Sequence, residues 1–230
     1  MFNKHNNNEN NYEIIVSTRP NSQYAESYRK LPIDIKYSSV DEEPCIIQVT
    51  SSVSGEHKTT TAANLAAVYV ELGYKVVLFD CDLRRPQVHR AAGIINDEGL
   101  TDYLIDKIDY QKLIKKTVYG FDAINAGNKV PYPHVVLHSM KFKNLLDELR
   151  KEYDYIIIDC PPVLVVTDSL IIAQLVDTTL FVINQKLVKK SETKEALRLL
   201  KEAEAKIAGI VLSNVTGKLA KKQKSYRAYY

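Results

Sequence analysis

The chain has 230 residues, 45% of them hydrophobic and 26% charged, with a formal net charge of +3. A chain of this length and composition can bury a core without disulfides, and one domain is the simplest organisation. The small net charge gives no argument for nucleic acid as a partner. The three cysteines form no C-x-x-C pair that would indicate a zinc or redox site, which favours a reduced cytosolic compartment.

The N-terminal region shows little regular patterning. Residues 1–12 are rich in asparagine and are predicted to be disordered, and they hold no apolar stretch typical of a secretory signal. Residues 24–30 can form a short helix, which Pro32 is expected to stop. We therefore expect a disordered segment over 1–23, a folded domain over 24–216 and a basic, tyrosine-bearing tail over 217–230.

From residue 44 onward, short apolar runs alternate with helical patterns. Strands are predicted at 45–50, 76–79, 123–125, 155–158, 179–183 and 208–212, and helices at 59–72, 99–105, 110–116, 140–151, 169–175 and 192–205. Ser139 and Ser191 are the predicted N-caps of two of these helices. The alternation predicts an α/β fold with a doubly wound, mostly parallel sheet and helices on both faces. Ligands of such sheets bind beyond the carboxyl ends of the strands, so the polar residues there are the candidates for a site.

The segment after the first strand has the form of a phosphate-binding loop, or P-loop. It reads Ser51-Ser52-Val53-Ser54-Gly55-Glu56-His57-Lys58-Thr59-Thr60 and lies between a predicted strand and a predicted helix, as a P-loop requires. Phosphate there would meet backbone N–H groups and a helix N-terminus, with Lys58 on the β- and γ-phosphates and the Thr59 hydroxyl on Mg²⁺. The candidate nucleotide-binding residues are Ser54, Gly55, Glu56, His57, Lys58, Thr59 and Thr60.

This loop departs from the pattern G-x-x-x-x-G-K-[ST]. Ser52 and His57 stand where the pattern has glycines, and His57 adds bulk where a glycine lets backbone approach phosphate. We expect weaker nucleotide binding than a glycine would give. The alternative is a serine- and threonine-rich loop that merely leads into a helix.

Two further strands end in aspartates. Residues 77–79 are apolar and precede Asp80 and Asp82, whose carboxylates would repel each other unless a cation such as the Mg²⁺ of ATP lies between them. One carboxylate can then hold metal-bound water while the other accepts a proton from an attacking hydroxyl. Residues 156–158 lead in the same way into Asp159, as in a Walker B strand, whose aspartate contacts Mg²⁺. The alternative is that these aspartates only cap helices and turns. The presence of both strands after a P-loop favours a nucleotide site.

These motifs together resemble those of the bacterial tyrosine kinases of capsule and exopolysaccharide assembly, P-loop proteins related to the MinD/ParA ATPases. The family motif of three apolar residues followed by D-x-D-x-R is matched in full by residues 77–84 and is continued by Arg85-Pro86. Asp159-Cys160-Pro161-Pro162-Val163 with Asp168 also fits the family pattern. The resemblance covers residues 24–216.

The resemblance implies an ATP-dependent tyrosine autokinase that uses ATP and Mg²⁺. It implies catalytic roles for Lys58, Asp80, Asp82 and Arg84, in which Asp80 assists deprotonation of the acceptor tyrosine. It also implies that Thr59, Asp82 and Asp159 bind the metal and that Asn214 lies near the adenine. The acceptors would be Tyr226, Tyr229 and Tyr230 of the tail, phosphorylated between subunits of a homo-oligomeric ring. The implied partners are a membrane polysaccharide co-polymerase, whose cytoplasmic tail completes the nucleotide site, and a tyrosine phosphatase. The chain is accordingly expected in the cytoplasm, at the inner face of the cell membrane through its partner.

Some positions differ from the family pattern, and two other functions stay open. The oligomer motif E-x-x-R-x-x-R appears as Glu26-x-x-Arg29-x-x-Pro32, and Ser213 stands where an asparagine is expected. The alternatives are a MinD/ParA-like ATPase that positions a partner and an adaptor that scarcely turns over ATP. MinD/ParA proteins usually carry a second lysine early in the loop, and residues 51–53 hold none, so the tail tyrosines and the aspartate motif favour the kinase.

Overall fold

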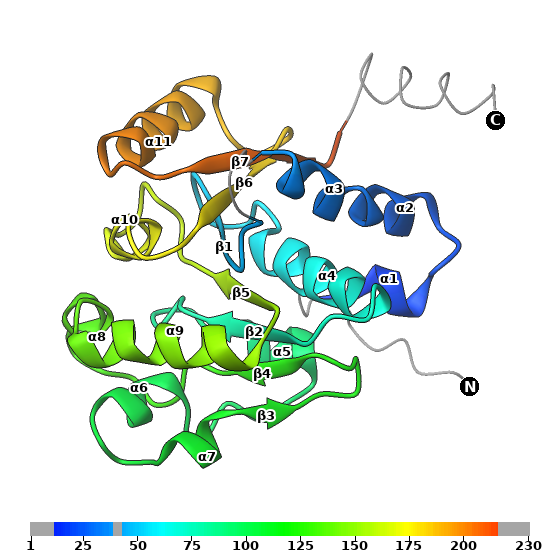
Figure 1. Ribbon diagram of the computed structural model, residues 1–230. Coiled ribbons are helices and arrows are strands. Elements are labelled where there is room, and N and C mark those ends of the chain that lie inside the picture. The colour runs from blue at the N-terminus through cyan, green and yellow to red at the C-terminus, as the bar shows by residue number, and fades with distance from the viewer. Residues whose placement is uncertain (1–11, 39–42, 216–230) are drawn as a thin grey trace, which may run out of the picture.

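The computed structural model describes residues 12–38 and 43–215, which form a seven-stranded sheet covered by helices (Figure 1). The strands are β1 (Ile46–Ser51), β2 (Val76–Asp80), β3 (Lys115–Lys116), β4 (Asp122–Ile124), β5 (Tyr155–Asp159), β6 (Thr178–Asn184) and β7 (Ile207–Ser213). They lie in the order β3-β4-β2-β5-β1-β6-β7, and all neighbours are parallel except the pair β3 and β4. The predicted mostly parallel sheet is confirmed.

Helices lie on both faces of this sheet (Figure 1). On one side are α1 (Ile15–Thr18), α2 (Gln23–Arg29), α3 (Leu31–Lys36), α4 (Lys58–Glu71) and α5 (Val88–Ala92). On the other are α6 (Leu100–Leu104), α7 (Tyr110–Leu113), α8 (Pro133–Leu137), α9 (Met140–Glu152), α10 (Asp168–Ala173) and α11 (Lys190–Glu202). Successive strand residues point to opposite faces. Leu78 therefore packs in the core beneath α4, whereas Phe79 packs in the core beneath α9, and the doubly wound arrangement is confirmed.

The strand order brings the two aspartate strands and the P-loop strand together. β5 lies between β2 and β1, with Asp80 paired in register with Asp159 and Asp159 paired with Val49. The loop that follows β1 therefore leaves the sheet beside both aspartates. The pairing of β1, β2 and β5 thus brings together the P-loop and the two aspartate motifs, which lie far apart in the sequence.

The folded part of the chain begins earlier than the sequence predicts. Ile14 and Val16, within the segment expected to be disordered, are 1% and 0% exposed and pack in the core with α4. The Asn64 side chain on α4 donates to the Glu13 carbonyl at 2.9 Å and accepts the Val16 N–H at 3.1 Å. This tertiary contact orders residues 12–18, and local composition cannot reveal it. Residues 1–11 of the predicted disordered segment lie outside the described residues.

Local sequence signals predict some helix ends correctly and miss others. Ser139 caps α9 as predicted, its Oγ accepting the Phe142 N–H at 3.2 Å. Ser191 does not cap α11, which begins at Lys190 and has the Glu192 carboxylate on the Lys189 N–H. The helix predicted at 24–30 is present as α2, which ends at Arg29 ahead of Pro32, as expected. Pro32 itself lies in the first turn of α3, where its missing N–H has no helical partner to lose. The sequence does not predict the short elements α1, α5, α8 and β3, although it predicts α6, α7 and β4, which are equally short.

Candidate active site

The loop between β1 and α4 has the backbone conformation of a phosphate-binding loop. Gly55 and His57 have φ values of +87° and +70°, and α4 begins directly afterwards at Lys58. Loops with such left-handed residues form a concave surface of N–H groups, which here lies at the positive end of a 14-residue helix. The conformation therefore suits an anion such as a phosphate group.

The side chain of Glu56 has a structural role that the sequence did not reveal. It is fully buried, and its Oε2 accepts the Val53 N–H at 2.8 Å while its Oε1 accepts the Asn184 N–H at 3.0 Å. The carboxylate thereby fastens the P-loop to the end of β6. A ligand in the loop can meet the backbone of Glu56 but not its carboxylate.

One ammonium group, one hydroxyl and two carboxylates gather at the carboxyl ends of β2 and β5. Lys58 Nζ lies 3.0 Å from Asp82 Oδ2 and 3.6 Å from Asp159 Oδ1, and Thr59 Oγ1 donates to Asp159 Oδ2 at 2.6 Å. All four of these residues are at most 8% exposed. The structure thus brings together Lys58, Thr59, Asp82 and Asp159, which the sequence proposed as one site.

Burial and mutual charge shift the titration of this cluster. Burial alone would lower the pKa of Lys58, but the charges of Asp159 and Asp82 outweigh it and raise that pKa, so the ammonium stays protonated. Burial raises the pKa of Asp159, against the opposing effects of Lys58 and Thr59. Burial and then the charge of Asp159 raise the pKa of Asp80 to about 8. The carboxylates thus outnumber the one lysine that faces them, which favours an added cation at this point.

Asp80 is buried at the end of β2 and holds the loop that follows this strand. Its Oδ1 accepts the Asp82 N–H at 3.1 Å, and its Oδ2 accepts the N–H groups of Gln87 and Val88 at 2.9 Å each. Asp80 is 0% exposed. The sequence predicted a residue that assists proton removal, whereas the contacts in this structure are those of a positioning residue.

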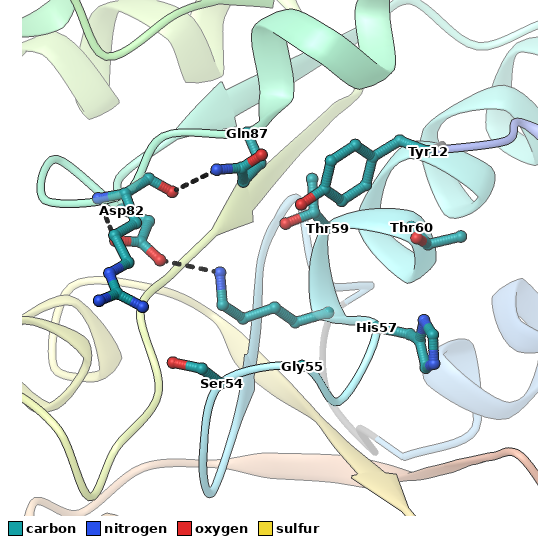
Figure 2. Close-up of a pocket in the computed structure, with 10 residues that line it drawn as sticks. Tyr12, Ser54, Gly55, His57, Thr59, Thr60, Asp82 and Gln87 are labelled. Carbon is teal, nitrogen blue, oxygen red and sulfur yellow. Dashed lines mark hydrogen bonds and ion pairs between the residues drawn. The ribbon is translucent and has the colours of Figure 1, made fainter. Parts of the chain in front are cut away.

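A pocket of about 300 Å³ opens above the P-loop (Figure 2). Most of the predicted nucleotide-binding residues line it, namely Ser54, Gly55, His57, Lys58, Thr59 and Thr60, together with Asp82. Tyr12, Arg85 and Gln87 also line it and were not predicted as site residues. Arg85 follows the D-x-D-x-R motif and could have been inferred, but no sequence signal marks Tyr12 or Gln87.

A second pocket of about 530 Å³ adjoins the first, since His57 and Thr60 line both. Its other walls include Tyr28 from α2, Lys186 and the end of β7 with Asn214. The Asn214 amide lies 3.1 Å from His57 Nε2. The predicted adenine-side residue therefore lies next to the P-loop but in the neighbouring pocket.

Two groups of predicted residues lie apart from the phosphate pocket. Arg84 Nε pairs with Asp168 Oδ2 at 3.3 Å, and its side chain is 43% exposed rather than among those lining the pocket. Tyr226, Tyr229 and Tyr230 lie outside the described residues.

The residues present suit a magnesium ion bound together with nucleotide phosphates. Within the described part of the chain, Asp159 Oδ1 is buried without a hydrogen-bond partner. A hydroxyl and two carboxylates are hard oxygen donors of the kind that Mg²⁺ prefers, and its remaining ligands are usually phosphates and water. Thr59, Asp82 and Asp159 would therefore hold Mg²⁺ here.

His57 stands in a conformation that favours glycine. Its φ of +70° is left-handed, and its imidazole lines both pockets. Figure 2 shows the imidazole on the side of the phosphate pocket away from Asp82. A non-glycine residue in this region costs roughly 1–2 kcal/mol. The side chain therefore adds both strain and bulk to the loop.

His57→Gly is expected to tighten ATP binding several-fold and to raise the free energy of unfolding by about 1 kcal/mol, since it removes both bulk and strain. His57→Ala is the matched control, because it opens the same space but keeps a β-carbon at the left-handed position. It should tighten ATP binding without the gain in stability. Calorimetric ATP titration and urea unfolding measure the two effects, and no gain of affinity in either variant would contradict the steric role of His57.

Comparison with known proteins agrees with this geometry. A family model described as an AAA domain matches residues 45–207. The chain is 34% identical to the tyrosine-protein kinase YwqD of Bacillus subtilis (strain 168), over 94% of this chain and 90% of that protein. It is 30% identical to the tyrosine-protein kinase Etk of Escherichia coli (strain K12), over 89% of this chain but 28% of the longer Etk.

Solved structures share the fold. The chimeric protein CapA2B2 superposes with a TM-score of 0.85 at 33% identity, covering 89% of this chain and 90% of that one. The septum site-determining protein MinD of Pyrococcus horikoshii, complexed with Mg-ADP, has a TM-score of 0.63 at 23% identity, covering 77% and 76% of the two chains. The second similarity concerns the fold alone.

Proposed function

The chain belongs to the bacterial tyrosine-protein kinases, and we propose that it transfers the γ-phosphate of ATP to tyrosines of its own C-terminal tail, in the service of capsular or extracellular polysaccharide synthesis and export. The observation that carries this proposal is the cluster of Lys58, Thr59, Asp82 and Asp159 beside the P-loop. Phosphoryl transfer depends mainly on positioning and charge neutralisation, which such a cluster supplies.

The residues of the phosphate pocket would have separate roles in binding phosphate, binding metal and accepting a proton. The backbone of residues 54–58 would bind the phosphates, and Lys58 would turn from Asp82 to the β- and γ-phosphates. Thr59, Asp82 and Asp159 would hold Mg²⁺, which when bound neutralises the charge that develops on the phosphates. Asp82 lines the pocket, so the oxygen of its carboxylate that is not on Mg²⁺ would accept the proton of the attacking tyrosine, while Asp80 would position the Asp82 loop.

The second pocket would take the nucleoside, with Asn214 on the adenine side. Its position beyond His57 and Thr60 supports this, because a nucleotide with its phosphates on the P-loop would extend in that direction.

One assay separates the kinase from its alternatives. Purified protein is incubated with ATP, Mg²⁺ and a peptide of the membrane activator's cytoplasmic tail, and both phosphotyrosine and free phosphate are measured. The kinase forms phosphotyrosine on the tail. Free phosphate alone would support a MinD/ParA-like ATPase, and neither product would support an adaptor.

Changing Tyr226, Tyr229 and Tyr230 together to phenylalanine is expected to remove most of the phosphotyrosine and to leave ATP affinity unchanged, because these side chains would serve as acceptors while the residues of the P-loop bind the nucleotide. Mass spectrometry of the phosphopeptides and an ATP titration measure this. The control changes the exposed Tyr37 and Tyr132, which are 81% and 68% exposed, and should retain the label. Label that persists unchanged in the tail variant would show that the acceptors lie elsewhere.

We propose that the kinase works with partners at the inner face of the cell membrane. None of the helices in the described ranges is long and apolar enough to span a membrane. The chain matches 28% of the longer Etk protein. The activator would be a polysaccharide co-polymerase. A tyrosine phosphatase would reverse the modification.

Assembly into a ring would involve the α2 surface. Arg29 of the shortened oligomer motif bonds within the chain, with its Nε 2.9 Å from Glu71 and its Nη1 2.5 Å from Glu26. To contact a second subunit, Arg29 would have to keep these bonds to Glu71 and Glu26 while adding another, or break them.

A further inference from the structure

Among the described residues that line the phosphate pocket, Tyr12 is the one that carries a hydroxyl and comes from outside the P-loop and the aspartate strands. Figure 2 shows its ring entering from the N-terminal segment, with the hydroxyl end directed towards the Thr59 side of the pocket. Lys58, Thr59 and Asp82 line the same space. A tyrosine hydroxyl of the chain itself therefore lies in the pocket where the γ-phosphate would be transferred.

The backbone on the C-terminal side of Tyr12 is held firmly against the P-loop helix. The buried Asn64 amide bonds to the Glu13 carbonyl and to the Val16 N–H, and it also donates to the Thr60 carbonyl at 2.8 Å. The aromatic ring packs against the same core that contains Ile14 and Val16. Since Asn64 and Thr60 both belong to α4, this bonding fixes the residue after Tyr12 relative to Lys58.

The charges around Tyr12 suit a phosphate acceptor. Burial raises the pKa of Tyr12, so the phenol carries its proton at neutral pH and needs a base when it reacts. Lys58 and Arg90 act on the phenol as positive neighbours, and Arg85 lines the same pocket. Guanidinium and ammonium groups are the usual partners of a phosphorylated side chain.

We propose that Tyr12 is a second phosphoacceptor, modified in cis by the active site of its own subunit, in contrast to tail tyrosines that are modified between subunits. This inference rests on the proposed kinase function. The Tyr12 oxygen would attack the γ-phosphorus of ATP, so that a new O–P ester bond forms and the bond from the γ-phosphorus to the β,γ-bridging oxygen breaks. ADP leaves with that oxygen, and the phenolic proton passes to the carboxylate of Asp82.

The first experiment removes the tail acceptors. In the variant with Tyr226, Tyr229 and Tyr230 changed to phenylalanine, the full chain incubated with ATP and Mg²⁺ should retain slow labelling, mapped by mass spectrometry to Tyr12. Adding Tyr12→Phe should reduce the residual label at least tenfold, whereas adding Tyr37→Phe, which alters an exposed tyrosine outside both pockets, should not. Residual label that survives Tyr12→Phe would overturn the assignment.

The second experiment tests the cis route. A ¹⁵N-labelled Lys58→Met chain is mixed with the unlabelled active chain, and phosphopeptides of the two isotopic forms are counted. Phosphate on Tyr12 should appear in the unlabelled peptides alone, at a rate per chain that is independent of protein concentration, while tail peptides of both forms are labelled. Equal labelling of Tyr12 in both forms, or tail label without any at Tyr12, would overturn this inference and leave the kinase proposal standing. Absence of phosphotyrosine from every peptide would overturn both.

Discussion

Replacing Lys58 with methionine is expected to lower phosphotyrosine formation by on the order of 10²–10³-fold, the cost of removing one preorganised charge from a transition state. The Lys58 ammonium is buried between Asp82 and Asp159, at 3.0 and 3.6 Å. With ATP bound, its ammonium would lie between the phosphates and these carboxylates. Without it, the negatively charged groups of the protein and of the triphosphate face one another, which weakens binding as well as transfer.

The control for this variant is Lys151→Met on α9. The Lys151 ammonium pairs with Glu148 on the surface at 2.7 Å, so the same substitution there should leave labelling within about twofold, in keeping with the small contribution of surface ion pairs. Phosphotyrosine is measured by quantitative mass spectrometry, and melting curves confirm that both variants are folded. Labelling by a folded Lys58→Met chain at a rate similar to the parent would remove this site from the mechanism.

Asp159→Asn is expected to have two opposite effects: a more stable nucleotide-free protein and the loss of magnesium-dependent activity. Burial raises the pKa of both Asp159 and Asp80, which are paired in register on neighbouring strands. A carboxyl group whose pKa is higher in the folded state destabilises that state once the pH exceeds its unfolded pKa of about 4. The nucleotide-free parent should therefore lose stability as the pH rises from about 4 through the folded pKa of Asp80, about 8.

An asparagine at position 159 removes the buried carboxylate whose charge helps to raise the pKa of Asp80. The variant should therefore melt a few degrees higher near neutral pH, since about 1 kcal/mol shifts the melting temperature of a chain this size by roughly 2–4 °C. The same change removes a magnesium ligand, so the stabilisation by ATP with Mg²⁺, relative to ATP with EDTA, should disappear. Phosphotyrosine formation should fall on the order of 10²–10³-fold.

Asp147→Asn, an exposed substitution on α9, serves as the control and should change neither quantity. If the Asp159→Asn variant were less stable and still gained full stability from ATP with Mg²⁺, the charge-crowded metal site would be the wrong description of this cluster. Differential scanning calorimetry over a pH series gives both readings from one preparation.

The regular part of the fold could be predicted because its signals are local. The apolar runs of β1, β2 and β5 and the small polar residues after them mark both the strands and the edge at which Lys58, Asp82 and Asp159 meet. Parallel pairing then brings the motifs together without further information. The cap of α9 by Ser139 was predictable for the same reason, since its donor lies three residues away.

The features that the sequence did not reveal depend on contacts between distant segments. Ile14 and Val16 are ordered by Asn64, which lies about fifty residues further on, and Glu56 reaches Asn184 across the sheet. Arg84 pairs with Asp168 and does not line the pocket. Its position in the motif cannot distinguish these two orientations of the side chain. Tyr12 enters the pocket because the segment after it is anchored, and an asparagine-rich neighbourhood gives no indication of that anchor.

The most direct test of the account is a structure of the chain bound to Mg²⁺ and a non-hydrolysable ATP analogue. We expect the triphosphate on the backbone of residues 54–58, Lys58 Nζ moved from Asp82 onto the β- and γ-phosphates, and the metal beside Thr59, Asp82 and Asp159. An analogue excluded from the loop by the His57 imidazole, or bound with the Lys58 ammonium still on Asp82 and no metal between the carboxylates, would contradict it.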